Sequence, residues 1–225
     1  MNIKKTIITT LALSSLLLGL TACESMEDGS AGGESSATAS TGIEAAKGEE
    51  AKVGKEYKKV VVNFIKSKQN SLLALGANSE ANKAAASLEA LEGVDAPTVD
   101  SLTRLQEENE IAGLDKSQKL SSAEAKVYFK KSVIFLSKAV AEETLLVKMV
   151  TDMAKNALAK IAAASIMEKG KLVKEFKPII DLAARLPEDL KITSSTLADY
   201  MSYAAQNGIS TDNLSDSTED ELENN

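Results

Sequence analysis

The stretch that decides the fold runs from residue 121 to residue 169 and reads SSAEAKVYFKKSVIFLSKAVAEETLLVKMVTDMAKNALAKIAAASIMEK. It contains no proline, and its apolar residues recur every three or four positions, as one face of an α-helix requires. Ser121-Ser122-Ala123-Glu124 at its start has the spacing of a capping box. The pattern predicts a long helix that opens at this box and runs to about Lys169.

Two apolar stripes follow this predicted helix. A helix that is apolar on two faces is buried on both sides, so we expect it to be central in a bundle. A bend or a break near Glu142-Glu143 or near Asn156 is the alternative. The first stripe holds Val133, Leu136, Val140, Val147, Val150, Ala154, Ala157, Ile161 and Ala164, and the second holds Leu146, Met149, Met153 and Ile166.

The rest of residues 49–209 carries the same helical period in shorter pieces, so we predict an all-α bundle of five to seven helices with a long central helix. The β-branched run Val60-Val61-Val62 leaves a strand there as a minor alternative. Pro178 and Pro187 predict interruptions near the C-terminal end. The predicted pieces are residues 49–75, 79–91, 97–111, 171–185 and 193–204, with turns or loops at 113–120 and 186–189.

The composition excludes several kinds of site. The chain of 225 residues contains no histidine and one cysteine. A histidine general base, a Ser-His-Asp triad, His-ligated metals and an internal disulfide are therefore excluded. We expect no cofactor and no metal site. The formal net charge of −7 opposes binding to phosphate backbones, so nucleic acid is not an expected partner.

The N-terminal 23 residues have the three parts of a bacterial export signal. Lys4 and Lys5 precede an apolar run from Ile7 to Leu20, which is short for a membrane-spanning helix. Leu20-Thr21-Ala22-Cys23 closely resembles the lipobox of bacterial lipoproteins. The resemblance implies that residues 1–22 are a signal peptide, that cleavage falls between Ala22 and Cys23, and that the Cys23 thiol is lipidated. An ordinary signal peptide with an incidental cysteine is the alternative.

Two segments flank the predicted bundle. Residues 23–48 are rich in Ser, Gly, Ala, Thr and Glu, which predicts a lipidated flexible linker. Residues 210–225 are acidic and polar, which predicts a disordered tail. The anchor implies a place in the cell envelope. Lipoproteins of enterobacteria-like systems that have Asp after the cysteine tend to stay in the inner membrane. Residue 24 is Glu, so the resemblance favours the periplasmic face of the outer membrane over the inner membrane.

Carboxylates and methionines are the remaining candidates for chemistry. Glu107-Glu108 with Glu110, and Glu142-Glu143, are predicted to lie on solvated helix faces. The methionines at 149, 153, 167 and 201 are predicted to be core residues, with an apolar ligand cavity as the alternative. No nucleotide-binding or hydrolase motif occurs, so we do not expect an enzyme.

These observations predict a membrane-anchored lipoprotein whose helical domain acts as a structural or partner-docking module. The expected partners are the membrane, through the lipid, and a protein of the envelope. The alternative is a carrier that binds a lipid or a small apolar ligand within the bundle.

Overall fold

The computed structural model describes residues 35–111, 114 and 117–211, and the described part contains five helices and no strand. The prediction of an all-α bundle with a long helix is confirmed. The helices are α1 (Ser35–Ala74), α2 (Asn78–Glu92), α3 (Val99–Glu108), α4 (Ala123–Ala163) and α5 (Ile166–Gln206).

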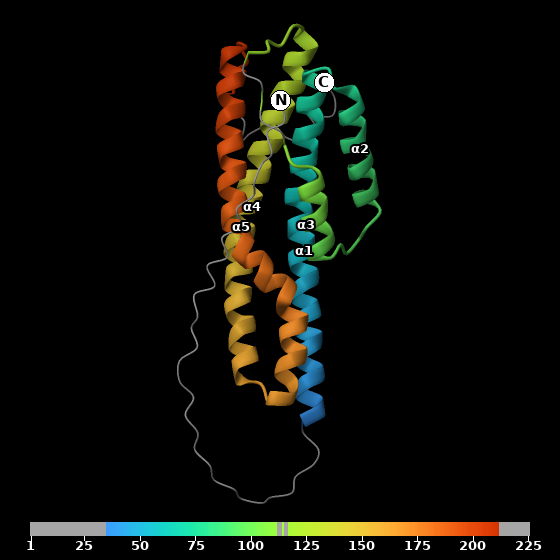
Figure 1. Cartoon of the computed structure of the whole chain (residues 1–225), viewed down its shortest axis with the longest axis vertical. Helices are drawn as coiled ribbons and strands as arrows, with labels where there is room; N and C mark the ends of the chain where they lie inside the picture. The colour runs from blue at the N-terminus through green and yellow to red at the C-terminus, as the bar shows by residue number, and fades with distance from the viewer. Residues whose placement is uncertain (1–34, 112–113, 115–116, 212–225) are drawn as a thin grey trace, which may run out of the picture. The chain divides into compact units, whose positions relative to one another are not determined.

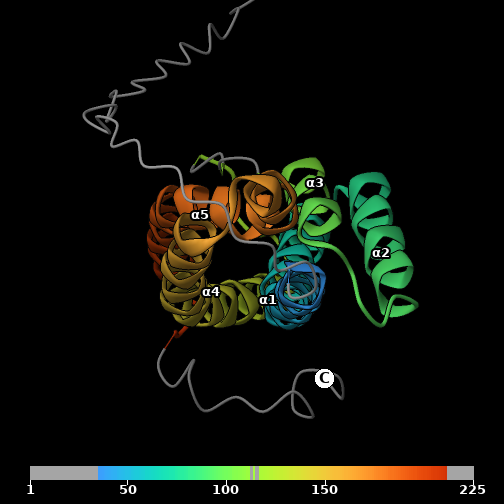
Figure 2. The same cartoon turned by 90° about the horizontal axis from the view of Figure 1, so that it is seen from below.

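Three long helices make up most of the helical unit. Helices α1, α4 and α5 lie side by side, with α4 running in the opposite direction to the other two (Figure 1). Helices α2 and α3 lie on one side of α1, away from α4 (Figure 2). Helix α1 therefore packs against all four other helices, while α4 is covered by α1 on one side and by α5 on another.

The core divides into two large apolar clusters along the long helices, with a small third one formed by Ile134 and Phe135. The first gathers around Phe176, Tyr57 and Val53, where α1 meets the end of α4 and the first half of α5. The second gathers around Phe129 and Tyr203, near the start of α4 and the end of α5. The ring centroids of Phe129 and Tyr203 lie 4.9 Å apart, a tilted contact of the kind that stabilises aromatic pairs.

Helix α4 ends earlier than the sequence predicted. It stops at Ala163 rather than near Lys169, and Ala164 adopts an extended conformation with ψ of 154°. The reason is a capping box at Ser165, in which the Glu168 carboxylate accepts hydrogen bonds from the Ser165 backbone N–H (3.2 Å) and hydroxyl (2.7 Å). These bonds start α5 at Ile166, and the alternative breaks near Glu142-Glu143 and Asn156 lie inside continuous helix. The capping box predicted at Ser121–Glu124 does not form, because Ser122 is the N-cap of α4 and its hydroxyl accepts from the backbone N–H of Ala125.

Helix α5 is continuous where the sequence predicted two helices and a turn. Pro178 and Pro187 both lie inside its 41 residues. Figure 1 shows that α5 changes direction midway, so the helix bends without ending. Each proline removes one backbone N–H, but the neighbouring Ile179 and Leu186 are completely buried and hold both halves against the core.

Helix α1 begins at Ser35, so residues 35–48, predicted as part of the flexible linker, are helical. Alanine, glutamate and lysine are good helix formers and dominate residues 44–52. Ala46 is completely buried in the first cluster, which supplies tertiary support for this early start. The predicted signal peptide, the linker as far as residue 34 and the tail from residue 212 lie outside the described residues.

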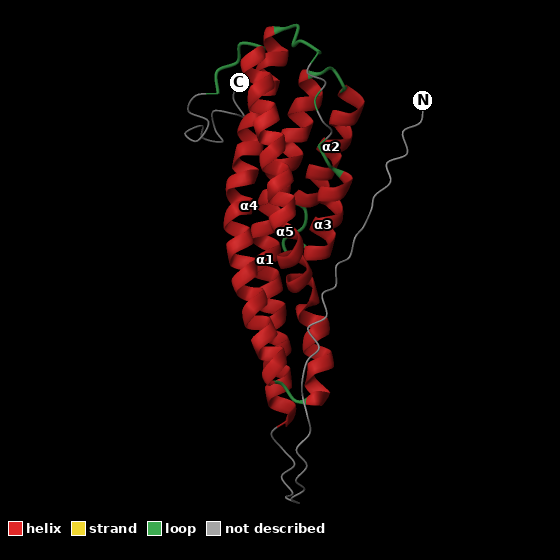
Figure 3. Ribbon diagram, turned by 60° about the vertical axis from the view of Figure 1, so that its left-hand side comes forward, coloured by secondary structure: helices red, strands yellow, loops and turns green. Residues whose placement is uncertain are grey.

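None of the helices in the described part of the chain is both long and apolar enough to cross a membrane. This outcome follows from their composition, since each long helix contains many charged residues. Figure 3 shows the described part of the chain as helices joined by loops, without a strand.

Candidate functional site

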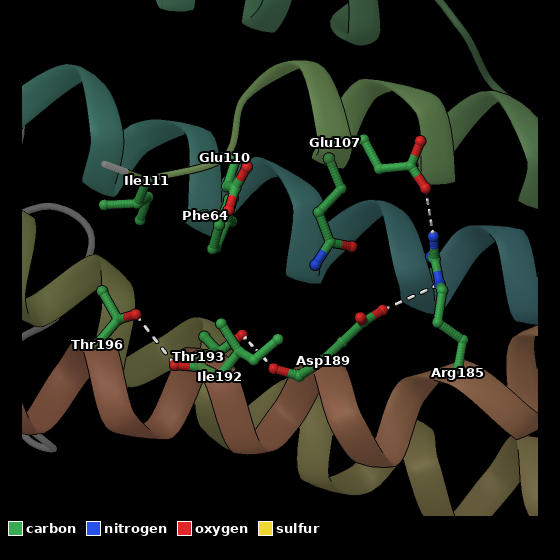
Figure 4. Close-up of a pocket in the computed structure, with 10 residues that line it drawn as sticks. Phe64, Glu107, Glu110, Ile111, Arg185, Asp189, Ile192, Thr193 and Thr196 are labelled. Carbon is green, nitrogen blue, oxygen red and sulfur yellow. Dashed lines mark hydrogen bonds and ion pairs between the residues drawn. The ribbon is translucent and has the colours of Figure 1, made fainter. Parts of the chain in front are cut away.

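A polar cluster lies between α1, α3 and α5, centred on the guanidinium group of Arg185. Its Nε and Nη1 atoms are each 3.0 Å from a carboxylate oxygen, of Asp189 and of Glu107 (Figure 4). Its Nη2 atom donates hydrogen bonds to the Tyr57 hydroxyl (2.6 Å) and to the Thr103 hydroxyl (3.0 Å). The guanidinium group thus links α1, α3 and α5, because its planar set of N–H donors can bond several partners at once.

The Tyr57 hydroxyl extends this cluster into the core. It accepts the hydrogen bond from Arg185 and donates one to the side-chain oxygen of Gln106 at 2.6 Å. Burial raises the pKa of Tyr57 to about 12, against the opposing effect of Arg185. Tyr57 therefore stays protonated at neutral pH and acts as a structural link between α1, α3 and α5 rather than as an acid or base.

The carboxyl group of Glu143 is close enough to Asp189 and Arg185 to interact with their charges, and its side chain is completely buried. Neither oxygen has a hydrogen bond of good geometry, and the adjacent Thr193 hydroxyl donates to the Asp189 carbonyl at 2.9 Å. Desolvation raises the pKa of Glu143 to about 7; repulsion from Asp189 adds to this, while Thr193 and Arg185 oppose it. Glu143 is thus partly protonated near neutral pH.

In front of the cluster is an open pocket of about 210 Å³. Its walls combine Phe64, Ile111 and Ile192 with the acidic side chains of Glu107, Glu110 and Asp189 (Figure 4). Arg185 is engaged with Glu107 and Asp189, whereas Glu110 is exposed and interacts electrostatically with Lys68 rather than with Arg185.

The chemistry of this pocket is that of cation recognition. Three carboxylates face one arginine, so ionisation of all three gives the pocket a net negative charge. The apolar side chains beside Glu110 suit the hydrocarbon stem of a lysine or arginine side chain, whose charged end the carboxylate would bind. No group of metal-ligating side chains occurs among the residues that the structure describes.

The residues predicted from the sequence have different outcomes. Cys23 and the cleavage position Ala22-Cys23 lie outside the described residues, so lipidation stays a prediction. Glu107, Glu108 and Glu110 are exposed, as predicted. Glu143 is buried, so the predicted solvated face is wrong there. Glu142 is half-buried and its carboxylate accepts a hydrogen bond from the Asn63 side-chain amide at 2.9 Å, so it is not fully solvated either. The two differ in burial because neighbouring residues of a helix point about 100° apart.

The prediction that the four methionines are core residues holds for two of them. Met149 and Met153 pack against the first core cluster, as predicted. Met167 and Met201 are exposed, so the predicted core position is wrong for both. Met167 is exposed because α4 ends before it and the chain turns there.

The Arg185 cluster was not predicted from the sequence. A usable pattern was present, since Arg185 is one of two arginines and stands four residues before Asp189, the spacing of an ion pair on a helix. Its other partners come from α1 and α3, and no local pattern indicates them. Comparisons of the chain with protein-family models, with curated proteins and with solved structures found no match.

Proposed function

We propose that this chain is a bacterial lipoprotein whose helical unit is a non-catalytic docking module in the cell envelope. The observation that carries the proposal is Leu20-Thr21-Ala22-Cys23 at the end of a short apolar run, in a chain with no other cysteine. A thioether-linked diacylglyceryl group with a further acyl chain gives stable membrane attachment, which one chain alone does not. Confinement at the membrane raises the effective concentration of the module for partners there.

The anchor is tested by metabolic labelling with palmitate in a bacterial host. We expect label in the wild-type chain and none in Cys23→Ser, while the control Glu24→Gln keeps the label. Intact mass should show a chain that begins at Cys23 and carries the lipid. Label that persists in Cys23→Ser would overturn the proposal.

The docking role is supported by the pocket beside Arg185. Glu110 offers an exposed carboxylate, and Ile192, which is 56% exposed, offers an apolar contact beside it. This combination fits a partner segment that inserts a lysine or arginine side chain. The charged and open lining is a poor environment for a hydrocarbon chain, which is why we favour docking over the lipid-carrier alternative.

A photoreactive amino acid in place of Ile192 tests this pocket in cells. We expect a discrete crosslinked product that disappears when Glu110→Lys is added, because the reversed charge repels a basic side chain. Arg185 pairs with Glu107 and Asp189 and not with Glu110, so this change leaves the Arg185 ion pairs intact. The control carries the same photoreactive residue at Leu145, which is exposed on a different helix, α4, and should give no such product.

A further inference from the structure

The turn between α4 and α5 carries the most exposed large apolar side chains of the described residues. Ile166 is 91% exposed and Met167 is 87% exposed. They are consecutive in the first turn of α5, directly after the extended Ala164 and Ser165. Isolated exposed apolar residues are ordinary, but two neighbouring ones at the end of a helical hairpin form a protruding apolar tip.

Three exposed lysines follow this apolar tip along the first turns of α5. Lys169, Lys171 and Lys174 are exposed on the first turns of α5, and the nearby Glu168 is half-buried and engaged with Ser165. Residues 160–174 contain four lysines, at 160, 169, 171 and 174, and one acidic residue, Glu168, although the chain as a whole is acidic. Apolar side chains next to lysines suit an interface with anionic lipid, where the apolar groups enter the acyl boundary and the lysines stay with the headgroups.

The tip lies at the same end of the helical unit as the start of α1 (Figure 1). The ion pair between Lys160 and Glu49, with Nζ and Oε1 2.7 Å apart, fixes the end of α4 beside the early part of α1. The neighbouring α1 surface is mixed in charge, with Glu44, Glu49 and Glu50 against Lys47 and Lys52. The lysines of α5 therefore dominate the tip itself.

Covalent geometry limits how far this end can be from a lipid on Cys23. Only 11 residues lie between Cys23 and Ser35, and even a fully extended chain joining the two spans at most about 40 Å. Helix α4, with 41 residues, is itself about 60 Å long. The lipid anchor thus holds the start of α1, and with it the apolar tip, near the bilayer.

We propose that Ile166 and Met167 insert into the surface of an anionic lipid bilayer and give the lipoprotein a second membrane contact, which orients the bundle. This inference rests on the proposed lipid anchor. It assigns the tip to the membrane and leaves the Arg185 pocket, farther along the bundle, available to partners.

The full lipidated chain offers a clean probe, because lipidation consumes its only thiol. A cysteine introduced as Met167→Cys is then the sole site for a polarity-sensitive fluorophore, with Leu145→Cys, at a position 71% exposed on the middle of α4, as the matched control. In vesicles of phosphatidylethanolamine and phosphatidylglycerol we expect a blue-shifted emission at position 167 that brominated lipid quenches. The label at position 145 should show neither effect.

A second substitution separates insertion from mere proximity. Adding Ile166→Glu to Met167→Cys should abolish the quenching while the protein still floats with the vesicles through its lipid. Intact mass distinguishes the two proposals: lipidated protein with no quenching at position 167 overturns the tip contact alone, and protein without lipid overturns the anchor. A blue shift without vesicles, dependent on protein concentration, would show that a second copy covers the tip and would also overturn the inference.

Discussion

The buried carboxyl of Glu143 should make the stability of the fold depend on pH. Its pKa is about 7 in the folded protein and near 4.5 when the chain is unfolded. The folded state therefore binds more protons between these values, and the free energy of unfolding falls as pH rises through this range. A difference of about 2.5 pKa units corresponds to about 3 kcal/mol, lost by pH 8.

Substitution of Glu143 by glutamine tests this effect. Because the amide cannot ionise, Glu143→Gln should gain about 3 kcal/mol relative to wild type between pH 5 and pH 8. Urea unfolding followed by circular dichroism across this range measures the difference between the two proteins. Curves that run parallel would show that the carboxyl does not change its protonation within the fold.

Glu143 also shows when the burial of a single residue can be predicted from the sequence and when it cannot. Glu142-Glu143 looks like one charged pair in the sequence, yet only Glu143 turns inward. Its burial depends on Thr193 and Asp189, which come from α5, about 50 residues away in sequence. Local pattern does not contain such contacts, so the core positions of α1 were predictable and the polar cluster was not.

Two glycines of α1, Gly48 and Gly54, should respond in opposite ways to substitution by alanine. Glycine within a helix normally costs about 1 kcal/mol relative to alanine. At Gly48 an added Cβ meets open space, so Gly48→Ala should raise the free energy of unfolding by about 1 kcal/mol. At Gly54 the Cβ would overlap the carbonyl oxygen of Pro97, so Gly54→Ala should destabilise the protein by about 1–3 kcal/mol.

The two variants control for each other, since they make the same chemical change in the same helix. Thermal or urea unfolding should move in opposite directions for Gly48→Ala and Gly54→Ala. Stabilisation by both substitutions would mean that the segment at Pro97 does not pack against α1 as described. Gly54 thus permits the close approach of the chain that leads into α3.

Helix boundaries were the weakest part of the sequence prediction, and the reasons are physical. The apolar period correctly indicated α1 and α4, because burial against neighbours follows that period. The boundary at Ser165 depends on a capping box inside an apolar stretch. The continuity of α5 through Pro178 and Pro187 depends on packing of its two halves, which outweighs the missing backbone hydrogen bonds.

Across the helical unit, stability should be uneven, with α2 opening before the three long helices. Helix α2 packs mainly against α1 and buries only Ala81, Ala84 and Leu91, whereas α4 is covered by both α1 and α5. Few buried apolar contacts mean a low free energy of local opening. Hydrogen exchange should therefore be faster for the amides of α2 than for those of α1, α4 and α5.

Truncation of one leucine in each region tests whether α2 opens on its own. Leu91→Ala removes a buried side chain from α2 and should cost about 2 kcal/mol, which speeds exchange in α2 roughly 30-fold. Because α2 opens separately, exchange in the long helices should change little. Leu146→Ala, in the middle of α4, is the matched control and should speed exchange in α1, α4 and α5 together, since these helices share one core. Equal acceleration of every helix by Leu91→Ala would mean that α2 unfolds only with the whole bundle.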